Sequence, residues 1–159
     1  MTMTDSALGG FRPALSPTAD DLAAFTPRRG RTVRVLVDQA DETPRWLPYV
    51  IGRLRELLHF AYDPDEGLPP PHPEAIQRAL PELIRFMRVD APTPSVVPTF
   101  EGGVQFVWHK GGWDVEVEVG PNETLVWAQR RDGSASWHGS LDDRVHDARA
   151  VMSEITAPA

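Results

Sequence analysis

The sequence predicts an α+β fold, in which an antiparallel β-meander of four to five strands is packed on one face by about three helices. The first observation behind this prediction is that apolar and polar residues alternate along the second half of the chain, in short runs separated by turn-forming residues. Such runs are typical of antiparallel strands with one buried face. The second observation is that three other segments repeat their apolar residues at helical spacing, which gives enough apolar surface to cover one side of a sheet.

The chain is expected to consist of a flexible N-terminal arm and a single α+β domain. Residues 1–30 mix Pro, Gly, Thr and Asp around one short apolar piece, which is typical of a loosely held segment. Residues 32–38 then alternate between valine and other side chains, which predicts a strand at the edge of the sheet. We therefore place the arm at residues 1–30 and the domain at residues 31–156.

Three amphipathic segments are predicted to form the helices. Pro73 suits the first turn of the middle helix, because a proline needs no N–H there, and Ser140 suits the N-cap of the last helix, because its hydroxyl can accept a backbone N–H. Pro81 lies inside the middle helix, where it is expected to cause a kink. The predicted helices cover residues 45–61, 73–88 and 140–155.

The alternating runs predict four strands joined by short turns. The sequences between them, KGG, GPNE and RDG, all contain residues that favour turns. The proline-rich stretch at residues 90–99 is interpreted as an extended connector. The predicted strands cover residues 104–109, 113–119, 124–130 and 134–138.

The segment GGVQFVWHKGGWDVEVEV, residues 102–119, is interpreted as a β-hairpin and not as a catalytic constellation. If Gly111 and Gly112 form a two-residue turn, Lys110 faces Trp113. The apolar pairs then share one face of the hairpin: Val104–Val119, Phe106–Val117 and Trp108–Val115. The other face carries the pairs Gln105–Glu118, Val107–Glu116 and His109–Asp114. A loop of odd length would mix the two faces, so the pattern favours this register.

The strand at residues 124–130 has apolar side chains in both directions. Leu125 and Trp127 point one way, and Val126 and Ala128 point the other way. Either the strand is buried on both faces, or Trp127 is exposed on the acidic side of the sheet. The first arrangement is favoured because most tryptophans lie in the core. The second would form an aromatic patch like those of protein-recognition surfaces.

The composition excludes several classes of function. The formal net charge is −7 and the pI is about 5.1, so a surface that binds nucleic-acid phosphates is not expected. The chain has no cysteine, which rules out disulfides, a thiol nucleophile and cysteine-ligated metal sites. No apolar run is long enough to cross a membrane, and the first ten residues lack the order of a signal peptide. We therefore expect a soluble cytoplasmic protein.

Two groups of residues are candidates for an enzymatic centre, and neither has the spacing of a known motif. One group is His109, Asp114 and Glu116; the other is Asp63, Asp65 and His72. Alternate carboxylates on a strand lie about 6 to 7 Å apart, which is wide for joint ligation of one metal ion. No nucleophile is tied to His109, and no glycine-rich nucleotide motif occurs. We expect no catalytic residue, metal or cofactor, and we keep a metal-dependent or hydrolytic enzyme as the alternative.

Two segments together resemble a group of small bacterial proteins with no established activity. The segments are YDPDEGLPPPHPEAIQRAL, residues 62–80, and VVPTFEGGVQFVWHKGGWDVEVEVGPN, residues 96–122. That group carries an aromatic-Asp-x-x-Gly loop, a Pro-Pro-x-x-Pro-Glu-Ala helix start and a Pro-Thr-x-x-Gly-Gly-Val-Gln-x-x-Trp hairpin. Its members usually have Trp and a shorter loop where this chain has Tyr62 and a Pro-Asp-Glu insertion. The resemblance implies helices followed by a meander, and an accessory partner more than an enzyme.

The leading hypothesis is a small protein-binding or adaptor protein that uses an acidic, tryptophan-containing face of the sheet. Its partner would be another protein, and the negative charge favours a basic one, of the kind that antitoxins or immunity proteins neutralise. The metal-dependent or hydrolytic enzyme is the first alternative, and a structural subunit that self-associates within a larger assembly is the second. The residues expected to contact the partner are His109, Asp114, Glu116, Glu118 and Trp127.

Overall fold

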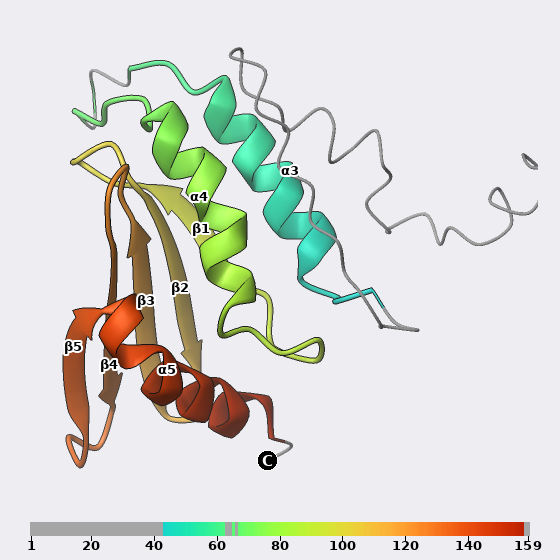
Figure 1. Ribbon diagram of the computed structural model, residues 1–159, viewed down its shortest axis with the longest axis vertical. Helices are drawn as coiled ribbons and strands as arrows, with labels where there is room; N and C mark the ends of the chain where they lie inside the picture. The colour runs from blue at the N-terminus through green and yellow to red at the C-terminus, as the bar shows by residue number, and fades with distance from the viewer. Residues whose placement is uncertain (1–42, 63–64, 66, 158–159) are drawn as a thin grey trace, which may run out of the picture.

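The computed structural model describes residues 43–62, 65 and 67–157 (Figure 1). The helices are α3 (Leu47–Leu58), α4 (Pro73–Ile84) and α5 (Leu141–Thr156). The strands are β1 (Ser95–Pro98), β2 (Val104–Lys110), β3 (Trp113–Val119), β4 (Thr124–Arg130) and β5 (Ser136–Ser140). They form one open antiparallel sheet in the order β1-β2-β3-β4-β5, so the predicted α+β meander is confirmed. The arm predicted at residues 1–30 and the strand predicted at residues 32–38 lie outside the described residues.

The sheet has an inner face, which packs against the helices, and an opposite outer face. Helices α3 and α4 lie against β1, β2 and β3, and α5 lies against β4 and β5 (Figure 1). Along each of the three central strands, every second side chain points into the core, which is the period expected of a strand with one buried face. The buried inner-face residues are Val96, Val104, Phe106, Trp108, Trp113, Val115, Val117, Val119, Thr124, Val126 and Ala128.

Three tryptophans belong to this core, and each has an acceptor for its indole N–H. The indole Nε1 of Trp46 donates to the carbonyl of Arg88 at 2.8 Å, and that of Trp108 donates to the carbonyl of Pro92 at 2.9 Å. The third, Trp113, donates to the Glu154 carboxylate at 3.0 Å. An indole N–H that is buried without an acceptor would be costly, so these bonds allow the large aromatic side chains to be buried.

The hairpin of β2 and β3 has the register that the sequence predicts. Val104 faces Val119, Phe106 faces Val117, and Lys110 faces Trp113. Gly111 and Gly112 form the turn with φ angles of 61° and 77°, a left-handed conformation that glycine adopts without steric cost. The two-residue turn therefore fixes which side chains point inward along both strands.

Replacing Gly111 with alanine is expected to destabilise the fold by about 2 kcal/mol, roughly 1 kcal/mol of which comes from the left-handed backbone. The remainder comes from a close contact, because a Cβ at this position would lie 3.1 Å from the Cα of Ile155 in α5. Gly112→Ala is the matched control, since its φ is similar but no atom lies within 4 Å of a Cβ built there. Urea unfolding followed by circular dichroism measures both losses. Equal losses would contradict the role of the Ile155 contact.

The starts of α4 and α5 agree with the prediction, whereas α3 runs from Leu47 to Leu58 within the predicted range 45–61. Ser140 is the N-cap of α5, and its hydroxyl accepts the N–H of Asp142 at 3.1 Å. The α4 helix ends at Ile84, four residues before the predicted end, because Arg85 and Phe86 continue as tighter turns whose N–H groups donate to residues three positions earlier.

The first and last strands also differ from the prediction. Residues 95–98, which were interpreted as part of a connector, form β1 and pair with β2. The last strand begins at Ser136 and not at residue 134, because Asp132 holds Ser134 in the turn: its carboxylate accepts both the N–H and the hydroxyl of Ser134, at 2.9 and 2.6 Å. This longer turn sets the register between β4 and β5.

Candidate functional site

The outer face is built from the side chains that the antiparallel register brings into rows across the sheet. One row runs from Val107 in β2 through Glu116 in β3 and Trp127 in β4 to His138 in β5. The next row contains Gln105, Glu118, Leu125 and Ser140. None of the three helices in the described part of the chain covers these rows, since their side chains are exposed or half-buried. The acidic and apolar residues of the sheet therefore meet on one open surface.

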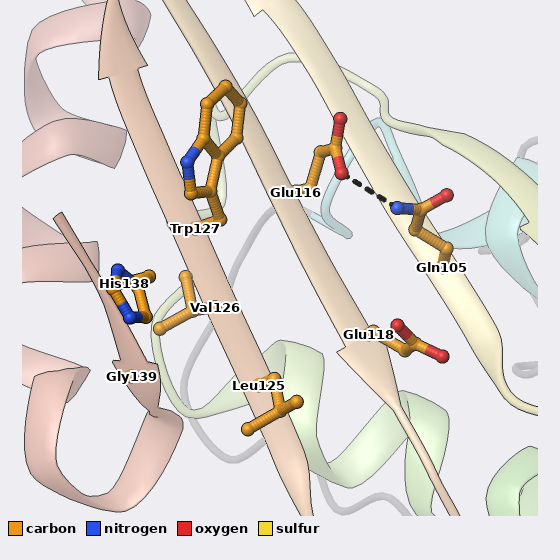
Figure 2. A pocket seen from close by; sticks show the side chains of 8 residues that line it. All are labelled: Gln105, Glu116, Glu118, Leu125, Val126, Trp127, His138 and Gly139. Carbon is orange, nitrogen blue, oxygen red and sulfur yellow. Dashed lines mark hydrogen bonds between the residues drawn. The ribbon is translucent and has the colours of Figure 1, made fainter. Parts of the chain in front are cut away.

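A pocket of about 310 Å³ lies between these two rows (Figure 2). Figure 2 shows the indole of Trp127 standing beside the Glu116 side chain, with Leu125 and Glu118 farther along the same two strands. His138 borders the pocket from β5, opposite Trp127. The pocket is lined by Gln105, Glu116, Glu118, Leu125, Val126, Trp127, His138 and Gly139. We call this the outer pocket.

Trp127 is on the outer face and not in the core, so the burial favoured from its residue type is wrong. Its neighbours in β4, Val126 and Ala128, point inward and are buried, which sends Trp127 and Leu125 to the outer face. Trp127 is half-buried, and Leu125 keeps 44% of its surface exposed. The indole N–H of Trp127 has no acceptor among the described residues, unlike those of the three core tryptophans. A side chain in this position is available for contact with another molecule.

Two carboxylates with different environments lie beside Trp127. The Glu116 carboxylate accepts a hydrogen bond from the amide Nε2 of Gln105 at 2.8 Å, and it directly faces Trp127 in the register. The Glu118 carboxylate has no hydrogen-bond or ion-pair partner within the described ranges. Because an amide carries no charge, neither carboxylate is neutralised by a cation among the residues that the structure describes. The outer pocket therefore has two negative charges at its border.

The remaining two predicted contact residues, His109 and Asp114, lie one row farther toward the turn of the hairpin. The ring Nδ1 of His109 donates to the Asp114 carboxylate at 2.7 Å, and the guanidinium Nε of Arg131 donates to the same oxygen at 3.0 Å. These partners compensate the charge of Asp114 within the molecule. The structure therefore brings Glu116, Glu118 and Trp127 together, and it places His109 and Asp114 on the same face but outside the pocket.

The Asp114 carboxyl is expected to titrate below the usual range for aspartate. Hydrogen bonds from His109 and then from Arg131 lower its pKa, and they outweigh the opposing effect of burial. Because the folded pKa is depressed, this carboxylate stabilises the fold above the unfolded value of about 3.9, and the contribution is lost as the pH falls through the folded pKa. A carbon-13 titration of the side-chain carboxyl measures the midpoint directly. His109→Gln with Arg131→Gln should raise it, and a midpoint at or above the ordinary value in the wild type would contradict the pairing.

A second pocket of about 150 Å³ continues the outer pocket toward the end of the sheet where β3 ends and β4 begins. The two pockets share Glu118 and Leu125. Two further carboxylates, those of Glu101 and Glu123, line the second pocket. The sequence did not point to this pocket, because its walls come from two separate loops that only the folded sheet brings together.

The sequence also missed His138 and Leu125 as members of the site. The length of the turn between β4 and β5 decides which face His138 lies on, and that length cannot be read from the motif RDG alone. A register for β4 and β5 would have placed His138 opposite Trp127. Leu125 carried a clear signal, since it shares the alternation of Trp127.

Within the described residues, neither alternative enzymatic centre forms a metal site. Among the described residues, no group of three or more His, Asp or Glu side chains is close enough to hold a metal ion. In the first group, Asp114 is engaged by His109 and Arg131, and Glu116 by Gln105. In the second group, Asp63 lies outside the described residues, and Asp65 and His72 are exposed.

Comparison with known proteins gives no family, curated protein or solved structure that matches this chain. No helix in the described ranges is long and apolar enough to span a membrane.

Proposed function

We propose that this protein is a binding protein that recognises another protein, of basic character, through the outer face of its sheet. The observation that supports this proposal is the position of Trp127 and Leu125, which lie beside the carboxylates of Glu116 and Glu118 on a face that the described helices leave open. Glu116 and Glu118 are the acidic contacts that we assign to this face. His109 and Asp114 would lie at its border.

The apolar part of the face supports binding more than it supports folding. A half-buried tryptophan and an exposed leucine at alternate positions of one strand gain little stability in the free protein, because water still reaches them. A partner that covers them removes that surface from water, and tryptophans in such positions often contribute most to the energy of an interface. The same two residues would therefore contribute much more in the complex than in the isolated chain.

The charge of the face supports a basic partner and disfavours self-association through the same surface. The whole chain carries a formal charge of −7, and the two carboxylates beside Trp127 have no cationic partner in the described part of the chain. Two copies that met through their outer faces would bring these carboxylates together, which is unfavourable. A positively charged partner would instead be attracted, and salt would weaken that attraction.

Capture of partners by the immobilised protein, from an extract of its native cell, tests the proposal when it is carried out with matched variants. A basic protein retained at low salt should be lost at high salt, and Trp127→Ala should reduce its retention by about tenfold or more. Glu116→Gln with Glu118→Gln should also reduce retention and flatten its salt dependence. The control pair is Glu56→Gln with Glu74→Gln, which removes two carboxylates from the helical layer. Retention that is equal in all four proteins would overturn the proposed role of the outer face.

A further inference from the structure

We propose that the outer pocket binds an arginine side chain of the partner, with its guanidinium lying on the indole of Trp127 and paired with the carboxylates of Glu116 and Glu118. The segment that carries this arginine is extended, and a second basic residue two positions along reaches the smaller acidic pocket. This inference rests on the proposed function and specifies the chemistry that the site recognises.

The combination of groups in the outer pocket matches a guanidinium better than other side chains. Glu116 faces Trp127 directly across two strands, so their Cβ atoms are about 5 Å apart. A guanidinium is flat, which lets it stack on an indole while its edge donates two parallel hydrogen bonds to a carboxylate. An ammonium group has no flat face, and an acidic side chain would be repelled. A volume of about 310 Å³ is at the lower end of ligand pockets, which fits one long side chain.

The protein contains a filled version of the same arrangement on its inner side. There, the guanidinium of Arg130 lies over the ring of Trp113, 5.1 Å from its centroid. The Glu154 carboxylate accepts hydrogen bonds from both Arg130 and the Trp113 indole. In the outer pocket, Trp127 and its carboxylates are in place, but no arginine in the described part of the chain lines the pocket. In this proposal, the guanidinium that completes the outer arrangement comes from the partner.

The second pocket extends the site in the direction of the strands. It shares Glu118 and Leu125 with the outer pocket and adds Glu101 and Glu123. In an extended segment, side chains two positions apart point the same way and lie about 6 to 7 Å from each other. Glu116 and Glu118 have the same spacing along β3, since they are alternate residues of one strand. A segment of the form Arg-x-Arg or Arg-x-Lys would place its first cation on Trp127 and its second near Glu101 and Glu123.

The test uses nitrogen-15-labelled full-length protein and the acetylated, amidated peptide Gly-Arg-Gly-Arg-Gly. The measured signal is the indole N–H of Trp127, which the variant Trp127→Phe identifies. We expect this signal to shift progressively with peptide concentration, while the indole signals of Trp46, Trp108 and Trp113 stay in place because these groups are buried and bonded within the protein. The same peptide with citrulline in place of both arginines keeps the side-chain shape and loses the charge. Its affinity should be lower by about tenfold or more.

Two pairs of variants locate the two cations. The comparison uses the peptide with two arginines and a second peptide in which glycine replaces one of them. Glu116→Gln with Glu118→Gln should lower the affinity for both peptides by about tenfold. Glu101→Gln with Glu123→Gln should weaken only the peptide with two arginines. Glu56→Gln with Glu74→Gln, on the helices, should change neither affinity. Binding of a lysine peptide that equals that of the arginine peptide would overturn the stacking on Trp127, since an ammonium cannot stack as a flat group.

The outcomes separate this inference from the proposed function. If the Trp127 signal does not move, or moves equally with the citrulline peptide, the arginine site is wrong. Should Trp127→Ala nevertheless abolish capture of the basic partner, the outer face would still be the binding surface. Conversely, if arginine peptides bind the pocket but Trp127→Ala leaves capture unchanged, the site exists and the proposed function is wrong.

Discussion

Replacing Trp108 with alanine is expected to lower the free energy of unfolding by about 3–5 kcal/mol, the usual cost of truncating a buried aromatic side chain. Only 3% of Trp108 is exposed. Its ring packs edge-on against Phe86, with centroids 6.1 Å apart, and its indole N–H donates to the carbonyl of Pro92. The substitution therefore removes apolar contacts and leaves both a cavity and an unsatisfied carbonyl.

Trp127→Ala is the matched control, because Trp127 lies in the same sheet and has the opposite orientation. We expect it to cost about 1 kcal/mol or less, since the side chain is half-buried and makes no hydrogen bond within the described chain. Urea unfolding of both variants, followed by circular dichroism, gives the comparison. Similar losses for the two variants would contradict the assignment of Trp108 to the core and Trp127 to the surface.

Val117→Asp is expected to destabilise the protein by about 3–5 kcal/mol or to prevent folding, because an unpaired carboxylate would be buried. Val117 is fully buried in the middle strand, between Phe106 of β2 and Val126 of β4. The matched control is Val107→Asp on the outer face. There a carboxylate reaches water, and it faces Glu116, so a loss of about 1 kcal/mol or less from like-charge repulsion is expected.

The pH dependence of Val117→Asp gives a second check on its mechanism. Burial raises the pKa of the introduced carboxyl above the unfolded value of about 3.9, so the penalty is present above that value and shrinks as the pH falls and the group is protonated. The deficit relative to the wild type, measured by urea unfolding from neutral to mildly acidic pH, should therefore decrease. A deficit that is independent of pH, or equal to that of Val107→Asp, would contradict the burial of this position.

The hairpin of β2 and β3 was predictable residue by residue because two independent signals agree. Apolar side chains occupy every second position on both strands, and the Gly-Gly pair allows only a short turn. A shift of one residue would expose Phe106, Val115 and Val117 and bury carboxylates, which is too costly to compete. Local pattern and burial energy therefore select the same register.

The parts that were not predicted depend on contacts between distant segments. The segment that forms β1 lies in a proline-rich stretch, which favours an extended connector as much as a strand. It becomes a strand by pairing with β2. Whether Trp127 is buried depends on which face of β4 the helices cover. The alternation does not decide this, because both faces of the strand carry apolar side chains. The second pocket needs the loop at Glu101 to lie beside the loop at Glu123. In each case the deciding interaction is absent from the local sequence.

Glu154 shows how the same residue types serve structure on one side of the sheet and are available for binding on the other. Hydrogen bonds from the Trp113 indole and from Arg130 lower the pKa of its carboxyl, so it stays ionised and holds α5 to the hairpin. Glu118 has no such partners in the described part of the chain. The difference is that Arg130 pairs with Glu154, whereas no cation among the described residues pairs with Glu118.

The most direct test of the account is to map the surface of the isotope-labelled protein that changes when the captured basic partner binds. Chemical-shift changes of backbone amides and the Trp127 indole report each position separately. The account predicts that the largest changes occur at Glu116, Glu118, Leu125 and Trp127, with smaller changes at His109 and Asp114. Changes confined to α3, α4 or α5, with these outer-face signals unmoved, would show that the partner binds elsewhere and would contradict the account.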